Sequence, residues 1–179
     1  MTEPSPIDPG DQAAIAAQLQ RLPRGIVEVG HRCGCGLPDV VTTLPRLPDG
    51  TPFPTTYYLT CPRAASRIGT LESEGVMKQM EFRLTQDPDL AADYRAAHER
   101  YLAAREAVGS EAGLEVPEIA GISAGGMPTR VKCLHVLAGQ ALAQGPGANR
   151  LGDEVLAELG QWWAQGPCVT VDAPEESDR

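Results

Sequence analysis

The chain has 179 residues, of which 42% are hydrophobic and 22% charged, as expected of one globular domain. With 24 acidic and 15 basic residues, its net charge of -9 argues against nucleic-acid binding, which needs clustered Lys and Arg. No apolar run approaches the roughly 20 residues of a membrane span, and the amino terminus has no signal-peptide pattern, so we expect a cytoplasmic protein without membrane insertion.

The two ends of the chain have the composition of disordered segments. Residues 1–10 are rich in Pro, Ser and Asp, and residues 169–179 form an acidic tail. We therefore expect a single domain over residues 11–168.

The amino-terminal part of this domain predicts one helix and a small sheet. Asp11 is a suitable cap for a helix that reaches Leu22, and Pro23 ends it. Three segments rich in β-branched and aromatic residues follow, and they predict strands at 25–30, 39–44 and 55–60. Short turns join them, so we expect an antiparallel sheet of about three strands.

The rest of the domain predicts four to five helices. A helical pattern begins at Pro62 and is interrupted at Gly75. A longer helix over 88–108 has one apolar stripe, formed by Leu90, Tyr94, Ala97 and Tyr101. After a Gly-rich connection, further helices are expected at 128–144 and 152–164, the last containing Trp162 and Trp163. The fold class is therefore α+β, a small sheet packed against these helices.

Five cysteines and three histidines are the chemically distinctive residues, and most lie in three short clusters. The clusters are His31-Arg-Cys33-Gly-Cys35, Cys61-Pro62 and Cys133-Leu-His135. An odd number of cysteines in a reducing cytoplasm indicates free thiols or metal ligands. Because thiolate and imidazole bind borderline metals, we predict that Cys33, Cys61 and Cys133 converge on one ion.

The fourth ligand has three candidates, which are Cys35, His135 and His31. Residues two apart on a regular helix point about 200° apart, so Cys133 and His135 can share an ion only if the helix begins later than residue 128. Cys35 follows Cys33 in a flexible loop and meets no such objection. The metal-free alternative is that these residues are ordinary core cysteines and a core histidine.

Two other functions are compatible with the same residues. Cys61 precedes a helix, whose dipole would lower the thiol pKa, so it could be a nucleophile acting on an anionic substrate, with Arg130 and Lys132 as contacts. Alternatively, the acidic helix at 88–108 and the two tryptophans could bind a protein partner. Neither reading identifies that substrate or partner.

Three runs of sequence resemble a known bacterial family. They are Pro52-Phe-Pro-Thr leading to Leu59-Thr-Cys61-Pro62, then Leu71-Glu-Ser-Glu-Gly75-Val76, and Val131-Lys-Cys133-Leu-His135. Together they resemble the proteins grouped as domain of unknown function 501, over about residues 24–155. The family has no established activity to transfer.

The resemblance also implies something about the site. The family pattern includes Cys33 ahead of a Gly-x-Pro turn, matched here by Gly36-Leu37-Pro38, and it includes Cys61, Cys133 and His135 but varies at Cys35. This favours His135 as the fourth ligand. Members are often encoded beside septum-formation and exopolyphosphatase genes, which implies a cell-division or phosphate context.

The expected function is thus a metal-binding protein with a structural or regulatory site. Zinc is the expected metal, ahead of an iron–sulfur cluster. Four protein ligands would close the site, whereas three would leave a position for catalysis. The alternatives are an enzyme using a reactive cysteine or an open metal, and an adaptor in cell division.

Overall fold

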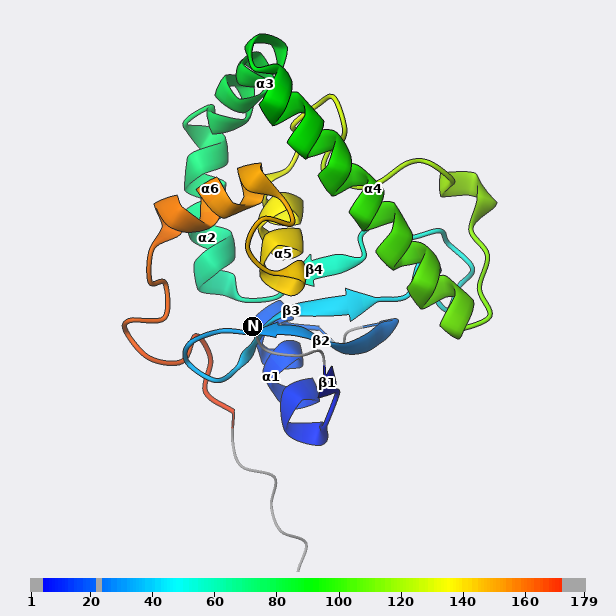
Figure 1. The fold of residues 1–179 in the computed structure, drawn as a ribbon. Helices are drawn as coiled ribbons and strands as arrows, with labels where there is room; N and C mark the ends of the chain where they lie inside the picture. The colour runs from blue at the N-terminus through cyan, green and yellow to red at the C-terminus, as the bar shows by residue number, and fades with distance from the viewer. Residues whose placement is uncertain (1–4, 22–23, 172–179) are drawn as a thin grey trace, which may run out of the picture.

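Antiparallel strands in the spatial order β1-β2-β3-β4 form the sheet of this protein (Figure 1). The computed structural model describes residues 5–21 and 24–171. Within these ranges the strands are β1 (Ser5–Pro6), β2 (Ile26–Arg32), β3 (Pro38–Thr43) and β4 (Tyr57–Leu59). The three strands predicted from sequence are confirmed, and β1 adds a two-residue edge.

The amino-terminal helix α1 (Pro9–Leu19) begins earlier than predicted. Asp8, not Asp11, is its cap and accepts a hydrogen bond from the Asp11 amide at 2.8 Å, while Pro9 suits the first helical turn. Residues 5, 6, 9 and 10 thus belong to regular structure although we predicted disorder for residues 1–10. The predictions for residues 1–4, 22–23 and 172–179 lie outside the described residues.

The sheet is covered on both faces. In Figure 1, α1 lies beneath the sheet and α5 (Leu134–Gln144) lies above it, and the contacts of α1 with β3 and of α5 with β2, β3 and β4 agree. The central strand β3 is therefore buried along its whole length, with Val40 and Val41 inside. A strand buried on both faces loses the polar alternation of a half-exposed strand.

The remaining helices surround α5. They are α2 (Pro62–Ser73), α3 (Val76–Gln86), α4 (Pro88–Glu111) and α6 (Arg150–Leu159), with a short 3₁₀ turn η1 (Pro117–Ile119). The predicted break at Gly75 is confirmed, because this residue has a φ of +84° between α2 and α3. The single-domain α+β fold predicted from sequence is confirmed.

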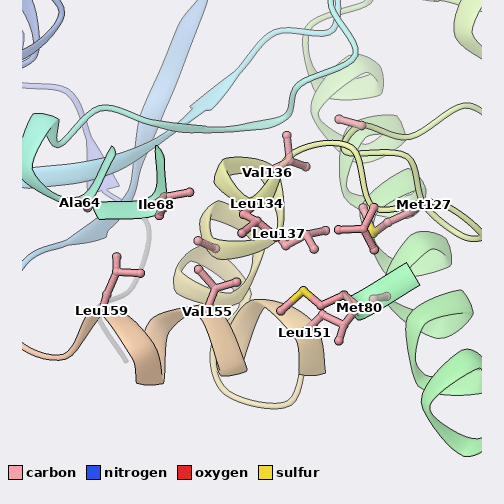
Figure 2. Close-up of a cluster of buried hydrophobic side chains, with 14 of the residues drawn as sticks. Ala64, Ile68, Met80, Met127, Leu134, Val136, Leu137, Leu151, Val155 and Leu159 are labelled. Carbon is pink, nitrogen blue, oxygen red and sulfur yellow. The ribbon is translucent and has the colours of Figure 1, made fainter. Parts of the chain in front are cut away.

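The hydrophobic core gathers around α5 (Figure 2). Ile68 of α2, Met80 of α3 and Val155 of α6 point toward the α5 residues Leu134 and Leu137. On α4 the predicted apolar stripe is buried as a unit, and it comprises Leu90, Tyr94, Ala97 and Tyr101. Since α5 contacts other elements on nearly all sides, seven of its residues are buried.

Boundaries of two later helices also differ from the prediction. Helix α5 begins at Leu134 and not at Pro128. The segment before it forms turns, in which the Arg130 amide donates a hydrogen bond to the Gly126 carbonyl and the Lys132 amide donates one to the Gly125 carbonyl. Helix α6 ends at Leu159, before Gly160, which has a φ of +57°. The later start of α5 decides the geometry of the site.

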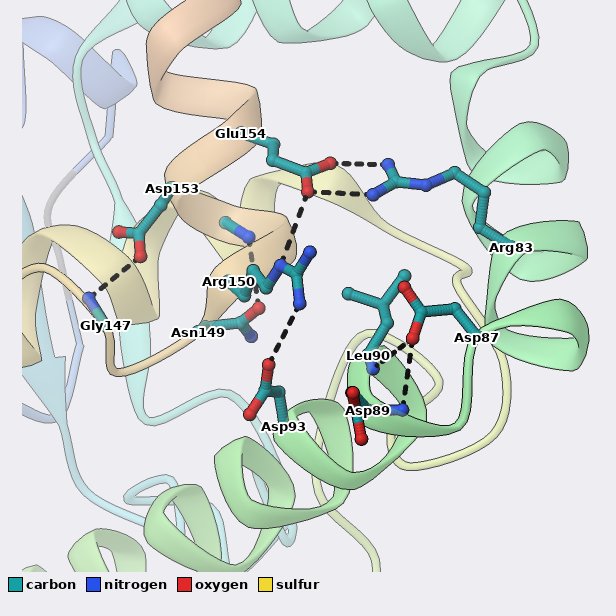
Figure 3. A network of polar contacts seen from close by, with 11 residues as sticks. Arg83, Asp87, Asp89, Leu90, Asp93, Gly147, Asn149, Arg150, Asp153 and Glu154 are labelled. Atoms are coloured by element: carbon teal, nitrogen blue, oxygen red, sulfur yellow. Dashed lines mark hydrogen bonds and ion pairs between the residues drawn. The ribbon is translucent and has the colours of Figure 1, made fainter.

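Ion pairs join α6 to α3 and α4 (Figure 3). The guanidinium of Arg83 meets both carboxylate oxygens of Glu154, at 2.6 and 2.9 Å, and Arg150 reaches Asp93 at 3.2 Å. These side chains are largely exposed, so each pair contributes only about 0–1 kcal/mol. The packing of the hydrophobic core therefore sets the orientation of these helices more than the ion pairs do.

No helix in the described ranges is long and apolar enough to cross a membrane.

Candidate metal site between α2 and α5

A carboxylate, a thiol and an imidazole meet where α5 begins. The ligand atoms of Glu72, Cys133 and His135 all lie within 4.8 Å of one another. In the described part of the chain this is the one group of three or more such side chains that is close enough to hold a metal ion. Glu72 comes from the last turn of α2, about 60 residues before the other two.

The backbone of Cys133 makes this meeting possible. Cys133 is the residue before α5, with the extended angles φ -158° and ψ 112°, so it does not follow the helical rotation that starts at Leu134. The objection that residues two apart on a helix diverge therefore does not apply. The structure brings Cys133 and His135 together because α5 begins later than the sequence indicates.

Glu72 does two things in this arrangement. Its Oε1 accepts a hydrogen bond from the Leu134 amide at 2.7 Å, which satisfies a free N–H in the first turn of α5. The same oxygen lies 3.2 Å from Nδ1 of His135. Glu72 is thus a helix cap supplied by another helix as well as a member of the polar cluster.

Both nitrogens of the His135 ring have a defined partner. Nε2 lies 3.2 Å from the Ala65 carbonyl oxygen, which only accepts, so Nε2 must carry a proton. The hydrogen bond with Cys133 and the nearby Glu72 carboxylate raise the pKa of His135 to about 9, although burial opposes this. The cluster therefore favours a positive charge on or beside the ring.

The other sequence-predicted ligands lie elsewhere. Cys33 and Cys35 face each other at the β2–β3 turn, with 3.0 Å between their sulfurs. His31 does not join them, since its Nδ1 lies 2.7 Å from the buried carboxylate of Asp39. Among the residues that the structure describes, Cys33, Cys61 and Cys133 do not form a group whose ligand atoms all lie within 4.8 Å of one another.

Cys61 precedes α2, but its environment differs from the one we expected of a nucleophile. It is 1% exposed, and burial raises its pKa to about 11, with a further contribution from neighbouring Cys168. Burial outweighs the helix dipole that would have lowered the pKa. Cys168, unassigned from sequence, contacts Gln18 Nε2 at 3.3 Å.

The structure also gives the positions of the residues proposed from sequence for anion and partner binding. Arg130 forms an ion pair with Glu81, and Lys132 is exposed. Trp162 is only 4% exposed and belongs to the core, so a partner could not reach it without rearrangement.

Glu72 is the residue that sequence reasoning undervalued. With Glu74 and Glu81 it reads as part of a solvated acidic helix face, which is the common case. The available signal was its place in the Leu71–Val76 run that resembles the family. Contact with residues so distant in sequence is a property of the packed fold.

The fold and the cluster together define a single-domain α+β protein with a mixed carboxylate, thiol and imidazole site. The chain belongs to the family described as Protein of unknown function (DUF501), whose model matches residues 29–157. Comparisons with curated proteins and with solved structures gave no match.

Proposed function

We propose that this protein is a cytoplasmic zinc-binding protein whose ion is held by Glu72, Cys133 and His135 and joins α2 to the start of α5. The observation that carries the proposal is the mutual distance of the three ligand atoms, all within 4.8 Å. A carboxylate, a thiolate and an imidazole are each established zinc ligands.

The hydrogen bonds of His135 support this assignment. With the proton on Nε2, the lone pair of Nδ1 faces Oε1 of Glu72 at 3.2 Å. Two lone pairs at this distance repel unless a proton or a cation lies between them. A metal ion can replace that proton, and the bond from Nε2–H to the Ala65 carbonyl is the support that metal-bound histidines usually have.

The donor set favours zinc over an iron–sulfur cluster. Iron–sulfur clusters are held mainly by several cysteine thiolates, and this group contains one. Mixed nitrogen, oxygen and sulfur ligands suit Zn²⁺, which has no geometric preference from its d electrons. Three protein ligands leave one position for water or a further ligand.

A regulatory role fits the open fourth position, and a stabilising role fits the places of the three ligands in the fold. Glu72 lies in the last turn of one core helix, and Cys133 and His135 lie at the start of another, so the ion would cross-link two helices that are far apart in sequence. Cross-links between distant segments restrict the unfolded chain more than local ones do. We therefore expect the metal to stabilise the packing of α5 against α2.

A second candidate, an enzyme with Cys133 as nucleophile, has one specific observation behind it. Cys133, His135 and Glu72 have the residue types of a thiol, a base and an orienting acid. Such a site would act without a metal. Cys61 is a poorer candidate because burial raises its thiol pKa.

Thiol alkylation distinguishes the two functions. We expect Cys133 in zinc-loaded protein to resist iodoacetamide at about pH 6 and to react once zinc is chelated, because a bound thiolate is not free to attack. The measurement is the alkylation rate of the Cys133 peptide by mass spectrometry, with Cys35 as internal reference. Rapid alkylation of Cys133 with and without chelator would support the nucleophile and contradict the zinc site.

The stability of the metal-free protein should depend on the charge of His135. Its folded pKa of about 9 exceeds the ordinary value of about 6.5, so its contribution to stability is complete below about pH 6.5 and is lost as pH rises through 9. We expect the difference in Tm between the wild type and His135→Gln, both in chelator, to shrink from about pH 6 to pH 10. A difference that stays constant over this range would contradict the assigned ion pair.

A further inference from the structure

The turn between β2 and β3 holds two free thiols against each other. The Gly36 amide donates to the Cys33 carbonyl at 2.8 Å, and the Cys33 amide donates to the Leu37 carbonyl at 3.0 Å. Gly36 has a φ of +89°, which the turn requires and which other residues rarely adopt. This backbone places the sulfurs of Cys33 and Cys35 only 3.0 Å apart.

The two thiols differ in access to solvent. Cys33 is 5% exposed, and burial raises its pKa to about 12. Cys35 is half-buried. An oxidant from solution therefore meets Cys35 first, with Cys33 in contact behind it. An accessible thiol next to a second, resolving thiol is the arrangement of reversible redox pairs.

The surroundings favour a dithiol over a metal site at this turn. In the ranges that the structure describes, no third His, Cys, Asp or Glu brings a ligand atom within 4.8 Å of both sulfurs. Two thiolates alone fill only two of the four positions around a zinc ion. Two adjacent thiols are sufficient, in contrast, for a disulfide.

We propose that Cys33 and Cys35 form a reversible dithiol–disulfide pair that is oxidised by low-molecular-weight disulfides. The Cys35 thiolate attacks one sulfur of the disulfide, forms a mixed disulfide and releases the first small thiolate. Cys33 then loses its proton to solvent and attacks the Cys35 sulfur, which releases the second small thiolate. The two cysteines are oxidised, one small disulfide is reduced, and the two leaving thiolates take up the two protons.

The indole of Trp163 lies on this turn, so tryptophan fluorescence can report the reaction. A Cβ atom at Gly34 would come within 2.4 Å of Trp163 Nε1, so Trp163 rests directly on the residue between the two cysteines. Trp162 and Trp163 also contact each other, with 4.6 Å between ring centroids. Closing the disulfide changes the turn beneath Trp163, so tryptophan emission should report oxidation.

The test uses the reduced, full-length protein after any bound metal has been removed with a chelator. The protein is incubated with glutathione disulfide at about pH 8, near the ordinary thiol pKa. We expect peptide mapping to show a Cys33–Cys35 disulfide, with a change in tryptophan emission that dithiothreitol reverses. In Cys33→Ser, the glutathione adduct of Cys35 should accumulate, whereas in the wild type it should be lost to the internal disulfide. In Cys35→Ser, Cys33 should stay reduced.

The outcomes that overturn the proposal are equally distinct. A glutathione adduct on Cys35 that persists in the wild type as it does in Cys33→Ser would show that Cys33 does not resolve it. A Cys61–Cys168 disulfide in place of Cys33–Cys35 would place the reaction elsewhere. Circular dichroism of both variants separates these results from misfolding, and Cys133→Ser should oxidise like the wild type.

Discussion

Protein purified without chelator should contain about one zinc ion per chain, and Cys133→Ser, His135→Ala and Glu72→Gln should each lose it. Each variant removes one ligand from the group whose atoms lie within 4.8 Å of one another. At a free zinc concentration of about 100 times Kd, binding stabilises the folded state by about 2.7 kcal/mol. For a chain of this size, that corresponds to a rise in Tm of roughly 5–10 °C.

Elemental analysis and thermal unfolding, with and without chelator, measure both effects. The matched controls are Cys35→Ser and Cys168→Ser, which remove partly buried thiols outside the group and should keep the metal and its stabilisation. Metal that is lost in Cys35→Ser but kept in His135→Ala would contradict our proposal. That result would instead support the site predicted from sequence, at Cys33, Cys61 and Cys133 with Cys35 as the fourth ligand.

The second large effect, on stability, is expected from adding a single methyl group at Gly152. Gly152→Ala should destabilise the protein by about 3 kcal/mol or more, because overpacking against backbone that cannot move exceeds the usual cost of 1–3 kcal/mol. A Cβ at this position would lie 2.2 Å from the Leu137 carbonyl oxygen and 2.9 Å from the Ala141 Cβ. The substitution forces α6 away from α5 at this contact.

Gly69→Ala is the control for this prediction. Gly69 lies within α2, and no atom comes within 4 Å of the Cβ that alanine would add. Because alanine has the higher helix propensity, we expect Gly69→Ala to stabilise the protein by about 0.5–1 kcal/mol. Urea unfolding monitored by circular dichroism gives both values. Similar transition midpoints for the two variants would show that the α5–α6 contact is not tight.

Local chemistry explains why most elements could be predicted. Strands β2, β3 and β4 coincide with the β-branched and aromatic segments, and the stripe from Leu90 to Tyr101 is buried on α4 as its spacing predicts. Gly75 interrupts the helices as expected. Boundaries were less accurate, because the cap at Asp8 and the turns before Leu134 depend on hydrogen bonds that a pattern does not specify.

The candidate site was predicted only in part. Cys133 and His135 were named from sequence and lie together in the structure, whereas Glu72 was interpreted as a solvated carboxylate. Cys33 and Cys35 lie together as a second pair, and Cys61 has Cys168 as its neighbour. Residue type showed which side chains can bind a metal, but not which of them meet.

The sequence by itself therefore determined the α+β class, the order of the elements, the family and the presence of metal-binding residue types. These depend on composition, periodicity and short motifs, which are local properties. Only the tertiary structure decided that α2 brings Glu72 to the first turn of α5, because that meeting depends on how α5 packs against α2 and the sheet. Packing of this kind is set by many contacts at once, and no single stretch of the chain encodes it.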